Sequence, residues 1–244
     1  MTTSKDTLDQ AIDKHYAKYP LHALVTGAES GLGAAITASL VATGWIVHSF
    51  DIKHAADVRD PQGTWGRPPP QLDALINCAG INRAEWLDAM TDELWDEVMG
   101  VNAKGIYKMS QWAMPSLKMR GGALVNIVSN ASHMPMTTSL AYNASKGAAH
   151  IMTLQLAREL RGSGVTVFGI SPNKLTGTGM SKDIEAQVLR LRGWTAEHAA
   201  KYQLASLPAG EETDPVEVAG LLSYLLSSKQ RHKYLHGCII PYGA

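Results

Sequence analysis

Three side chains in this chain, Tyr142, Lys146 and Ser129, have types and a spacing that suit chemistry on a bound oxygen atom. Tyr142 and Lys146 are four residues apart, and on a helix such positions share a face. A tyrosine is a poor base at neutral pH because its usual pKa is about 10. Lowering that pKa to near 7 takes about 4 kcal/mol, which a nearby positive charge can largely supply. Ser129 would then hold a substrate oxygen beside the phenol. Because a tyrosine and a lysine at this spacing also occur as a plain surface pair, the rest of the sequence decides between the two interpretations.

A glycine-rich turn, Thr26–Gly33, joins a short apolar segment to a helical pattern. Its spacing is G-x-x-x-G-x-G. Glycines let the backbone approach a pyrophosphate, and the following helix supplies unpaired N–H groups and the positive end of its dipole. The turn therefore predicts nucleotide binding, with contacts from Gly27, Ser30, Gly31, Leu32 and Gly33.

Asp51 follows the second apolar segment, and its charge bears on which nucleotide binds. A carboxylate there accepts hydrogen bonds from ribose hydroxyls and repels a 2′-phosphate. Glu29 adds negative charge and the turn contains no arginine; Lys53 and His54 are the contrary hints. We expect NAD, with NADP the less favoured cofactor.

Apolar segments alternate with longer helical patterns along the chain. The expected strands are His22–Thr26, Trp45–Asp51, Leu72–Asn77, Ala123–Ser129, Val165–Ser171 and Gly237–Pro241. The expected helices run from the glycine turn to Thr43 and over Thr91–Met119, Leu140–Arg161 and Pro215–Ser228. This alternation predicts a doubly wound α/β fold of the Rossmann type, with a mainly parallel sheet and helices on both faces.

The segment after Asp51 is too short for an ordinary helical crossover. The link from Asp60 to Leu72 is rich in proline and glycine and is a poor helix candidate. We therefore expect a shortened edge with only a rudimentary third strand near Ala56–Val58.

Length and composition narrow the classes of protein. The 244 residues suit a single domain over residues 21–244, after an extension (1–20) that includes a short helix around Thr7–Tyr19. A net charge of zero argues against nucleic acid as a partner. No apolar run approaches the length of a membrane span, and the first residues lack the apolar centre of a signal peptide. Cys78 and Cys238 lie in apolar segments, so we expect reduced, buried thiols and a cytoplasmic protein. No metal site is expected, because His232 and His236 have no carboxylate or cysteine at ligand spacing.

Taken together, these blocks resemble the short-chain dehydrogenase/reductase family over about residues 20 to 241. The matching blocks are the glycine turn, Asp51, the pair Asp57-Val58, the block Asn77-Cys78-Ala79-Gly80 and the set Asn102, Ser129, Tyr142 and Lys146. The resemblance implies that Asp57 and Val58 lie beside the adenine, and that Asn77, Ala79 and Gly80 also contact the cofactor.

The resemblance also implies the catalytic roles. Tyr142 would be the general acid/base, and Ser129 would orient the substrate carbonyl or alcohol. Lys146 would lower the pKa of Tyr142 and hold the nicotinamide ribose, while Asn102 would anchor a water in a proton relay. The family chemistry is hydride transfer at the nicotinamide ring.

The loop after Val165–Ser171 departs from the family pattern. The family's proline-glycine pair is Pro172-Asn173 here, and the threonine that follows comes one place late if it is Thr178, although Thr176 is an alternative. We expect cofactor contacts from Pro172 and Thr178.

Residues 173–212 have the length of a substrate lid, and Ile184, Val188 and Leu191 follow helical spacing within them. Candidate substrate contacts are Ser132, His133, Met180 and Trp194. Lys182, Arg190 and Arg192 are too sparse to indicate a CoA or carrier-protein substrate.

The expected function is interconversion of a secondary alcohol and a ketone. Two alternatives stay open: NADP-dependent reduction of a 3-oxoacyl carrier protein or another carbonyl, and oxidation of a ring cis-diol. A non-catalytic, cofactor-sensing protein is disfavoured, because Tyr142 and Lys146 are both present. By resemblance we expect a homodimer or homotetramer that pairs the helices of Thr91–Met119 and Leu140–Arg161.

Overall fold

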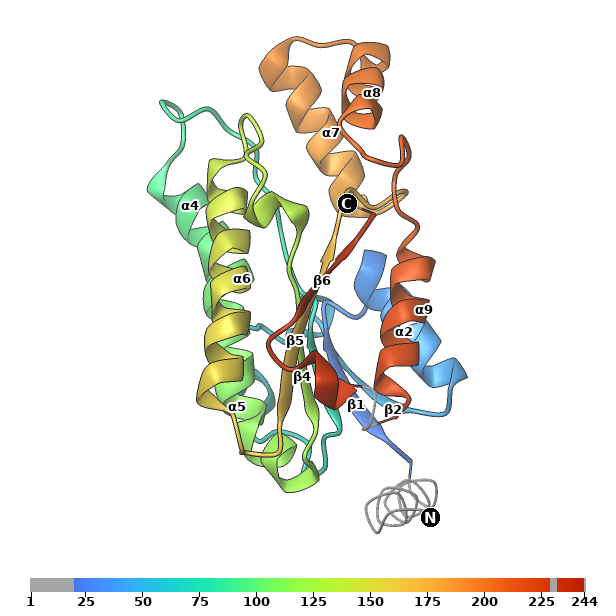
Figure 1. Ribbon diagram of the computed structural model, residues 1–244. Coiled ribbons are helices and arrows are strands. Elements are labelled where there is room, and N and C mark those ends of the chain that lie inside the picture. Colours follow the sequence, from blue (N-terminus) through green and yellow to red (C-terminus); the bar gives the residue numbers. More distant parts are fainter. Residues whose placement is uncertain (1–19, 229–231, 244) are drawn as a thin grey trace.

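The computed structural model describes residues 20–228 and 232–243 (Figure 1). The helix expected around Thr7–Tyr19 and nearly all of the extension 1–20 lie outside the described residues.

A six-stranded sheet, parallel throughout, forms the centre of the molecule. Its strand order is β2-β1-β3-β4-β5-β6. The strands are β1 (His22–Thr26), β2 (Ile46–Phe50), β3 (Ala74–Asn77), β4 (Ala123–Ile127), β5 (Thr166–Pro172) and β6 (Ile239–Tyr242). Every residue of β3, β4 and β5 is buried, as expected when helices cover both faces of a parallel sheet. The predicted doubly wound fold is confirmed.

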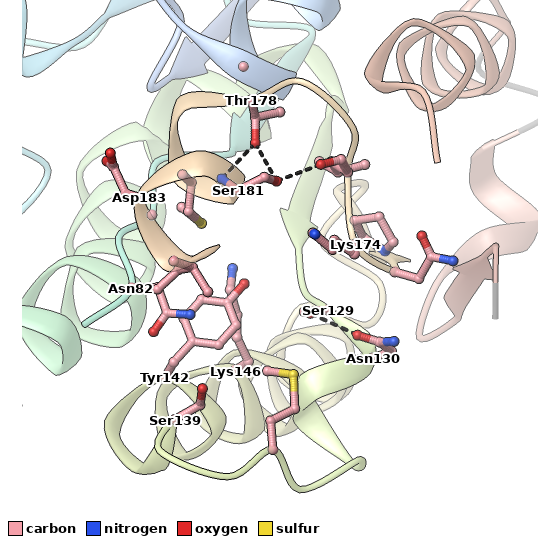
Figure 2. A pocket seen from close by; sticks show the side chains of 18 of the residues that line it. Asn82, Ser129, Asn130, Ser139, Tyr142, Lys146, Lys174, Thr178, Ser181 and Asp183 are labelled. Atoms are coloured by element: carbon pink, nitrogen blue, oxygen red, sulfur yellow. Dashed lines mark hydrogen bonds between the residues drawn. The ribbon is translucent and has the colours of Figure 1, made fainter. Parts of the chain in front are cut away.

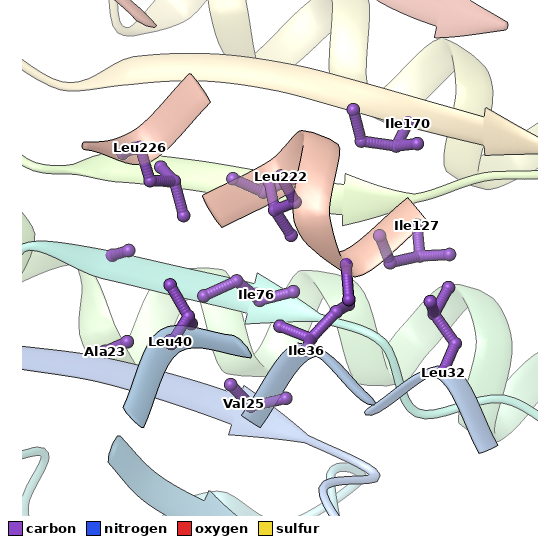
Figure 3. Close-up of a cluster of buried hydrophobic side chains, with 14 of the residues drawn as sticks. Ala23, Val25, Leu32, Ile36, Leu40, Ile76, Ile127, Ile170, Leu222 and Leu226 are labelled. Carbon is purple, nitrogen blue, oxygen red and sulfur yellow. The ribbon is translucent and has the colours of Figure 1, made fainter. Parts of the chain in front are cut away.

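Helices α2 (Gly31–Ala42) and α9 (Pro215–Leu226) cover one face of the sheet (Figure 1). Figure 3 shows Ile36 and Leu40 of α2 facing Leu222 and Leu226 of α9 above the strands. Successive strand residues point to opposite faces. Val25 therefore joins this cluster, whereas its neighbour Leu24 joins the core on the other side.

The opposite face carries α4 (Asp92–Met99), α5 (Gly105–Arg120) and α6 (Leu140–Glu159) (Figure 1). Thr91 caps α4 by accepting a hydrogen bond from the Leu94 N–H at 3.3 Å. A π-helical turn, Gly100–Lys104, connects α4 to α5. The single long segment expected over Thr91–Met119 is thus helical throughout, with a local widening around Asn102.

The rudimentary strand expected near Ala56–Val58 is absent, and that prediction was wrong. After β2, Asp51 caps a 3-10 turn (Ile52–His54), and Ala55 has a φ of +58°, which bends the chain away from the sheet. The link also holds a five-residue helix, α3 (Pro61–Trp65), where the proline and glycine content indicated none. Asp60 starts it by accepting a hydrogen bond from the Gly63 N–H.

Aromatic packing closes this edge in place of a strand. Phe50, at the end of β2, is fully buried and meets Trp65 and Trp112 edge-on, with ring centroids 5.1 and 5.9 Å away. The Trp112 indole N–H also donates to the Gly66 carbonyl at 2.9 Å. The link from β2 to β3 is therefore fixed to the middle of α5 through Gly66. It pairs with no strand.

Two helices, α7 (Gly179–Arg192) and α8 (Ala196–Ala205), lie beyond the carboxyl ends of the strands (Figure 1). The sequence pattern indicated one helix in this segment. The second has its own cap, because Thr195 accepts a hydrogen bond from the His198 N–H at 3.2 Å. The described residues also form two further 3-10 turns, Asn130–Ser132 and Lys233–Leu235.

Both cysteines are free thiols, but the expectation that both are buried was wrong. Cys78 is partly covered, whereas Cys238 is exposed just before the edge strand β6. Within residues 20–228 and 232–243, no helix combines the length and the apolar character that a membrane span requires.

Candidate active site

The glycine turn has the tight backbone that its sequence predicts. Gly33 lies against the Gly27 carbonyl, where a Cβ atom on Gly33 would come within 2.0 Å of that oxygen. Ser30 is the N-cap of α2, yet its hydroxyl makes no capping hydrogen bond, and the first turn of α2 contains no acidic residue. Gly27, Ser30, Gly31, Leu32 and Gly33 all line a cavity of about 610 Å³ at the carboxyl ends of the strands.

Thr26 joins this turn to the end of β3. Its hydroxyl accepts hydrogen bonds from the backbone N–H groups of Cys78 and Ala79, both at 2.9 Å. Ala79 and Gly80 consequently lie at the cavity wall. Asn77 does not: its amide donates to Asn126 and Ser110 in the interior below.

Asp51 lies beside the turn but is not part of the cavity wall. Its carboxylate accepts hydrogen bonds from the backbone N–H groups of Glu29 at 3.0 Å and Lys53 at 2.9 Å. Asp57 forms an ion pair with Arg59, whose guanidinium holds the pKa of the carboxyl below its usual value. Val58 is buried against Gly105. The structure therefore brings Asp51 to the glycine turn, and it leaves Asp57 and Val58 away from the cavity.

Ser129, Tyr142 and Lys146 converge at the floor of the cavity (Figure 2). Ser129 comes just after β4, and the other two extend from the first turns of α6. The Lys146 ammonium is buried, donates to the Ile127 carbonyl at 2.9 Å and lies 5.8 Å from the centre of the Tyr142 ring. The helical spacing in the sequence thus places both side chains beside the hydroxyl of Ser129.

Burial has the largest effect on the pKa values of Tyr142 and Lys146. Burial raises the pKa of Tyr142, which the hydrogen bond with the Ser129 hydroxyl partly offsets. Burial likewise lowers the pKa of Lys146 to about 8, while the neighbouring Cys78 acts to raise it. The Ser129 hydroxyl is the neighbouring group that acts to lower the Tyr142 pKa.

Asn102 is fully buried in the π-helical turn. Its amide donates to the Ile81 carbonyl at 2.8 Å and to the Ser145 hydroxyl at 2.9 Å, and its oxygen accepts from the Ile81 N–H. The side chain is therefore occupied in tying the loop after β3 to α6. This arrangement holds Ser145, and with it the turn that carries Tyr142 and Lys146.

Pro172, the last residue of β5, and Thr178, in the loop that follows, both line the cavity, as the sequence indicates. Thr178 caps α7 by accepting a hydrogen bond from the Ser181 N–H, and its methyl group faces Gly31. Asn173 needs no positive φ, and its side chain bonds to Thr213 and to the Gly243 carbonyl. Asn173, which stands where the family has the glycine of its proline-glycine pair, thus fastens the loop to the end of the described chain.

Of the four candidate substrate residues, Met180 and Trp194 line the cavity, and Ser132 and His133 do not. The Ser132 hydroxyl lies 3.1 Å from His133 Nδ1 and 3.2 Å from His150 Nδ1, so it is engaged with α6. The 3-10 turn after Ser129 rotates these two residues away from the cavity.

Several cavity residues carry no motif and were missed from the sequence. Asn82 is the most notable, because its buried side-chain oxygen has no hydrogen-bond partner in the described part of the chain. Others come from residues 173–212: Lys174, Ile184, Arg192, Tyr202, Gln203 and Leu207. Among these residues only Ile184 had a sequence signal, which was its helical spacing with Val188 and Leu191.

The glycine turn, the N-terminus of α2 and the Ser30 hydroxyl, which makes no capping hydrogen bond, fit a dinucleotide pyrophosphate. The turn lies where β1 has β2 on one side and β3 on the other, which is where ligands bind in open α/β sheets.

Comparison with known proteins agrees with this geometry. A model of the short chain dehydrogenase family matches residues 45–189. The chain is 31% identical to 2,3-dihydro-2,3-dihydroxybenzoate dehydrogenase of Escherichia coli (strain K12), over 90% of this chain and 95% of that protein. It is 30% identical to a 3-oxoacyl-acyl-carrier-protein reductase of Thermotoga maritima, over 89% and 94%.

Among solved structures, a putative 2-deoxy-D-gluconate 3-dehydrogenase from Agrobacterium tumefaciens with bound NADP superposes with a TM-score of 0.77. It is 28% identical, and the match covers 91% of this chain and 94% of that one. The chain therefore belongs to the short-chain dehydrogenase/reductase family of NAD(P)-dependent oxidoreductases that act on CH–OH groups.

Proposed function

We propose that the protein interconverts a secondary alcohol and a ketone, with Tyr142 as the general acid/base. The observation that carries the proposal is the convergence of Tyr142, Ser129 and Lys146 on one cavity that also contains the glycine turn. A bound nicotinamide cofactor supplies the hydride acceptor or donor.

Each side chain has a defined part in this proposal. The Ser129 hydroxyl, which already interacts with Tyr142, orients the substrate oxygen toward the phenol. Tyr142 removes the hydroxyl proton during oxidation and returns it during reduction. Lys146 is held by the Ile127 carbonyl with its charge close to the phenol, where it favours the phenolate and binds the nicotinamide ribose. Asn102 positions Ser145 and the first turns of α6, and in this proposal it also anchors a water of the proton relay.

We favour NAD over NADP as the cofactor. The Asp51 carboxylate lies at the glycine turn with its charge uncompensated by an arginine in that turn. Because Asp51, Asp57 and Val58 are outside the cavity wall, the adenosine would lie on a more open surface than the nicotinamide.

Ring cis-diol oxidation is a second candidate, and one observation favours it. The E. coli relative at 31% identity bears the name of a dehydrogenase of a dihydroxylated ring. The cavity also has apolar walls that suit a flat ring, formed by Met134, Met136, Met180, Ile184 and Trp194. Reduction of a 3-oxoacyl carrier protein is the other alternative, supported by the T. maritima relative.

Replacing Tyr142 tests the catalytic assignment. Tyr142→Phe removes the titrating oxygen but keeps the ring, so kcat on any alcohol that is turned over should fall by about 10²- to 10⁴-fold. Cofactor affinity should change little. The measurement is NADH formation across a panel of secondary and ring alcohols. Tyr234→Phe, in the exposed 3-10 turn Lys233–Leu235, is the matched control. Equal rates for Tyr142→Phe and the wild type would refute the assignment.

Asp51→Asn tests the cofactor preference. The amide keeps an acceptor oxygen for one of the two neighbouring N–H groups and removes the charge that repels a 2′-phosphate. We expect the ratio of kcat/KM for NAD to that for NADP to fall by about 10-fold or more, since a charge–charge interaction of about 1.4 kcal/mol gives that factor. Asp57→Asn is the control. An unchanged ratio in Asp51→Asn would contradict the proposed role.

The buried Lys146 predicts a pH dependence of stability. Because the folded protein holds the pKa of Lys146 near 8, below its usual 10.5, the unfolded chain binds more protons between these values. Stability should therefore rise by about 2 kcal/mol between pH 7 and 9.5 through this group. Lys146→Met should lose that rise. Urea unfolding of both cofactor-free proteins at the two pH values measures the difference, and equal pH slopes would contradict the prediction.

We also propose a homodimer or homotetramer formed through α5 and α6. Tyr107 and Met119 of α5 and Ile151 of α6 are exposed, with 48%, 72% and 61% of their surface accessible. Analytical ultracentrifugation should give a mass of at least twice 26.3 kDa, and Ile151→Asp should lower it. A wild-type monomer at micromolar concentration would end this proposal.

A further inference from the structure

Arg192 is a cation of the cavity wall that the proposed reaction does not use. It is the last residue of α7. Its Nη2 donates to the Thr137 carbonyl, and its guanidinium carbon lies 4.7 Å from the centre of the Trp194 ring. The side chain is thus held in place from two sides, by a loop and by an aromatic ring.

One hydrogen-bond donor of Arg192 is covered and unmet within the described residues. A guanidinium has five N–H donors. Arg192 Nε is screened from solvent and, within the described residues, has no acceptor. A covered donor without a partner costs free energy, so its retention calls for a ligand or another explanation.

Of the other basic residues of the cavity wall, Lys146 belongs to the proposed catalytic group, and Arg83 and Lys174 are paired with acids. Arg83 contacts Glu97 at 2.8 Å, and Lys174 contacts Glu212 at 2.6 Å. Across residues 20–228 and 232–243 no carboxylate lies within ion-pair distance of Arg192. Its positive charge is therefore available to a bound anion.

The position of Arg192 separates that anion from the cofactor phosphates. Thr178, at the start of α7, faces the glycine turn. The fourteen residues of α7 place Arg192 about 20 Å farther along the helix axis. Thr137, which Arg192 contacts, is only five residues before Tyr142, a reach of at most about 17 Å. Arg192 thus belongs to the side of the cavity that the loop leading to Tyr142 lines.

We propose that Arg192 binds a carboxylate of the substrate, so that the protein acts on a hydroxy acid or keto acid whose body is apolar. This inference rests on the proposed alcohol–ketone chemistry at Tyr142. Met134, Met136 and Val188 supply apolar walls for the body of that molecule. The guanidinium presents its N–H groups to two carboxylate oxygens at once, which selects an acid over its neutral analogue.

Binding of benzoate and benzamide tests the proposal without any turnover. The two probes have the same ring and nearly the same shape but differ in charge. Calorimetric titration uses the full-length protein saturated with NAD or, if NAD does not bind, with NADP. Benzoate should bind the wild type at least 10-fold more tightly than it binds Arg192→Gln, whereas benzamide should bind both equally weakly.

Arg190→Gln is the matched control, because Arg190 lies two residues earlier on α7, is exposed and has an acidic neighbour, Glu85, at 4.0 Å. It should keep the wild-type affinity for benzoate. Arg192→Lys retains the charge without the planar fork and should bind benzoate with intermediate affinity. It replaces Arg192→Gln in the comparison if the latter fails to bind the cofactor.

Equal benzoate affinity in the wild type and Arg192→Gln would overturn the proposal, as would a wild type that does not prefer benzoate to benzamide. Tyr142→Phe should bind benzoate normally while lacking turnover. Failure of the catalytic assignment therefore appears in the rates of Tyr142→Phe, and failure of the carboxylate site appears in the benzoate affinities.

Discussion

The close approach of two turns, at the carboxyl ends of β1 and β3, is the constraint on which the site depends. The Thr26 hydroxyl accepts two backbone hydrogen bonds from the turn after β3. Gly27 lies so near Ala79 that a Cβ atom on Gly27 would come within 2.9 Å of the Ala79 Cα. With the turns at this separation, the N-terminus of α2 and the residues after β3 line one cavity. Any side chain larger than hydrogen at Gly27 would separate them.

The second half of the site depends on a charge kept out of water. Lys146 is buried under Tyr142 and has a carbonyl oxygen, at Ile127, as its hydrogen-bond acceptor. Burying an ammonium without a carboxylate partner is unfavourable, which is why its pKa falls. The surrounding sheet and the network of Asn102 and Ser145 hold the lysine there against that cost. This arrangement lowers the stability of the folded protein, and it places the positive charge of Lys146 beside the phenol of Tyr142.

The sequence predicted the parts whose physics is local or periodic. The apolar strands, the glycine turn and the i, i+4 spacing of Tyr142 and Lys146 each identify a short segment by itself. The missing strand depended on how Phe50, Trp65 and Trp112 meet across the fold, which no local pattern contains. Ser132 and His133 are adjacent to Ser129 in sequence, but one 3-10 turn decides that they face α6. Arg192 becomes notable only in three dimensions, because among the described residues no acidic side chain lies within ion-pair distance of it.

The segment that contains α7 and α8, residues 173–212, is attached to the rest of the protein in a different manner from the other helices. Val188 is the sole buried residue of α7, and Ala199 the sole one of α8. Polar contacts make most of the attachment: the Ala84 N–H to Gln187 at 2.8 Å, the Trp86 indole to the Leu191 carbonyl at 3.2 Å, and Arg192 to Thr137. Water can replace such bonds at little net cost, whereas it cannot replace the apolar contacts of α2 and α9. Local unfolding of α7 and α8 thus requires less free energy than unfolding of the sheet. We propose that the two helices separate from the cavity as one unit, and that breaking these few hydrogen bonds limits the release of product.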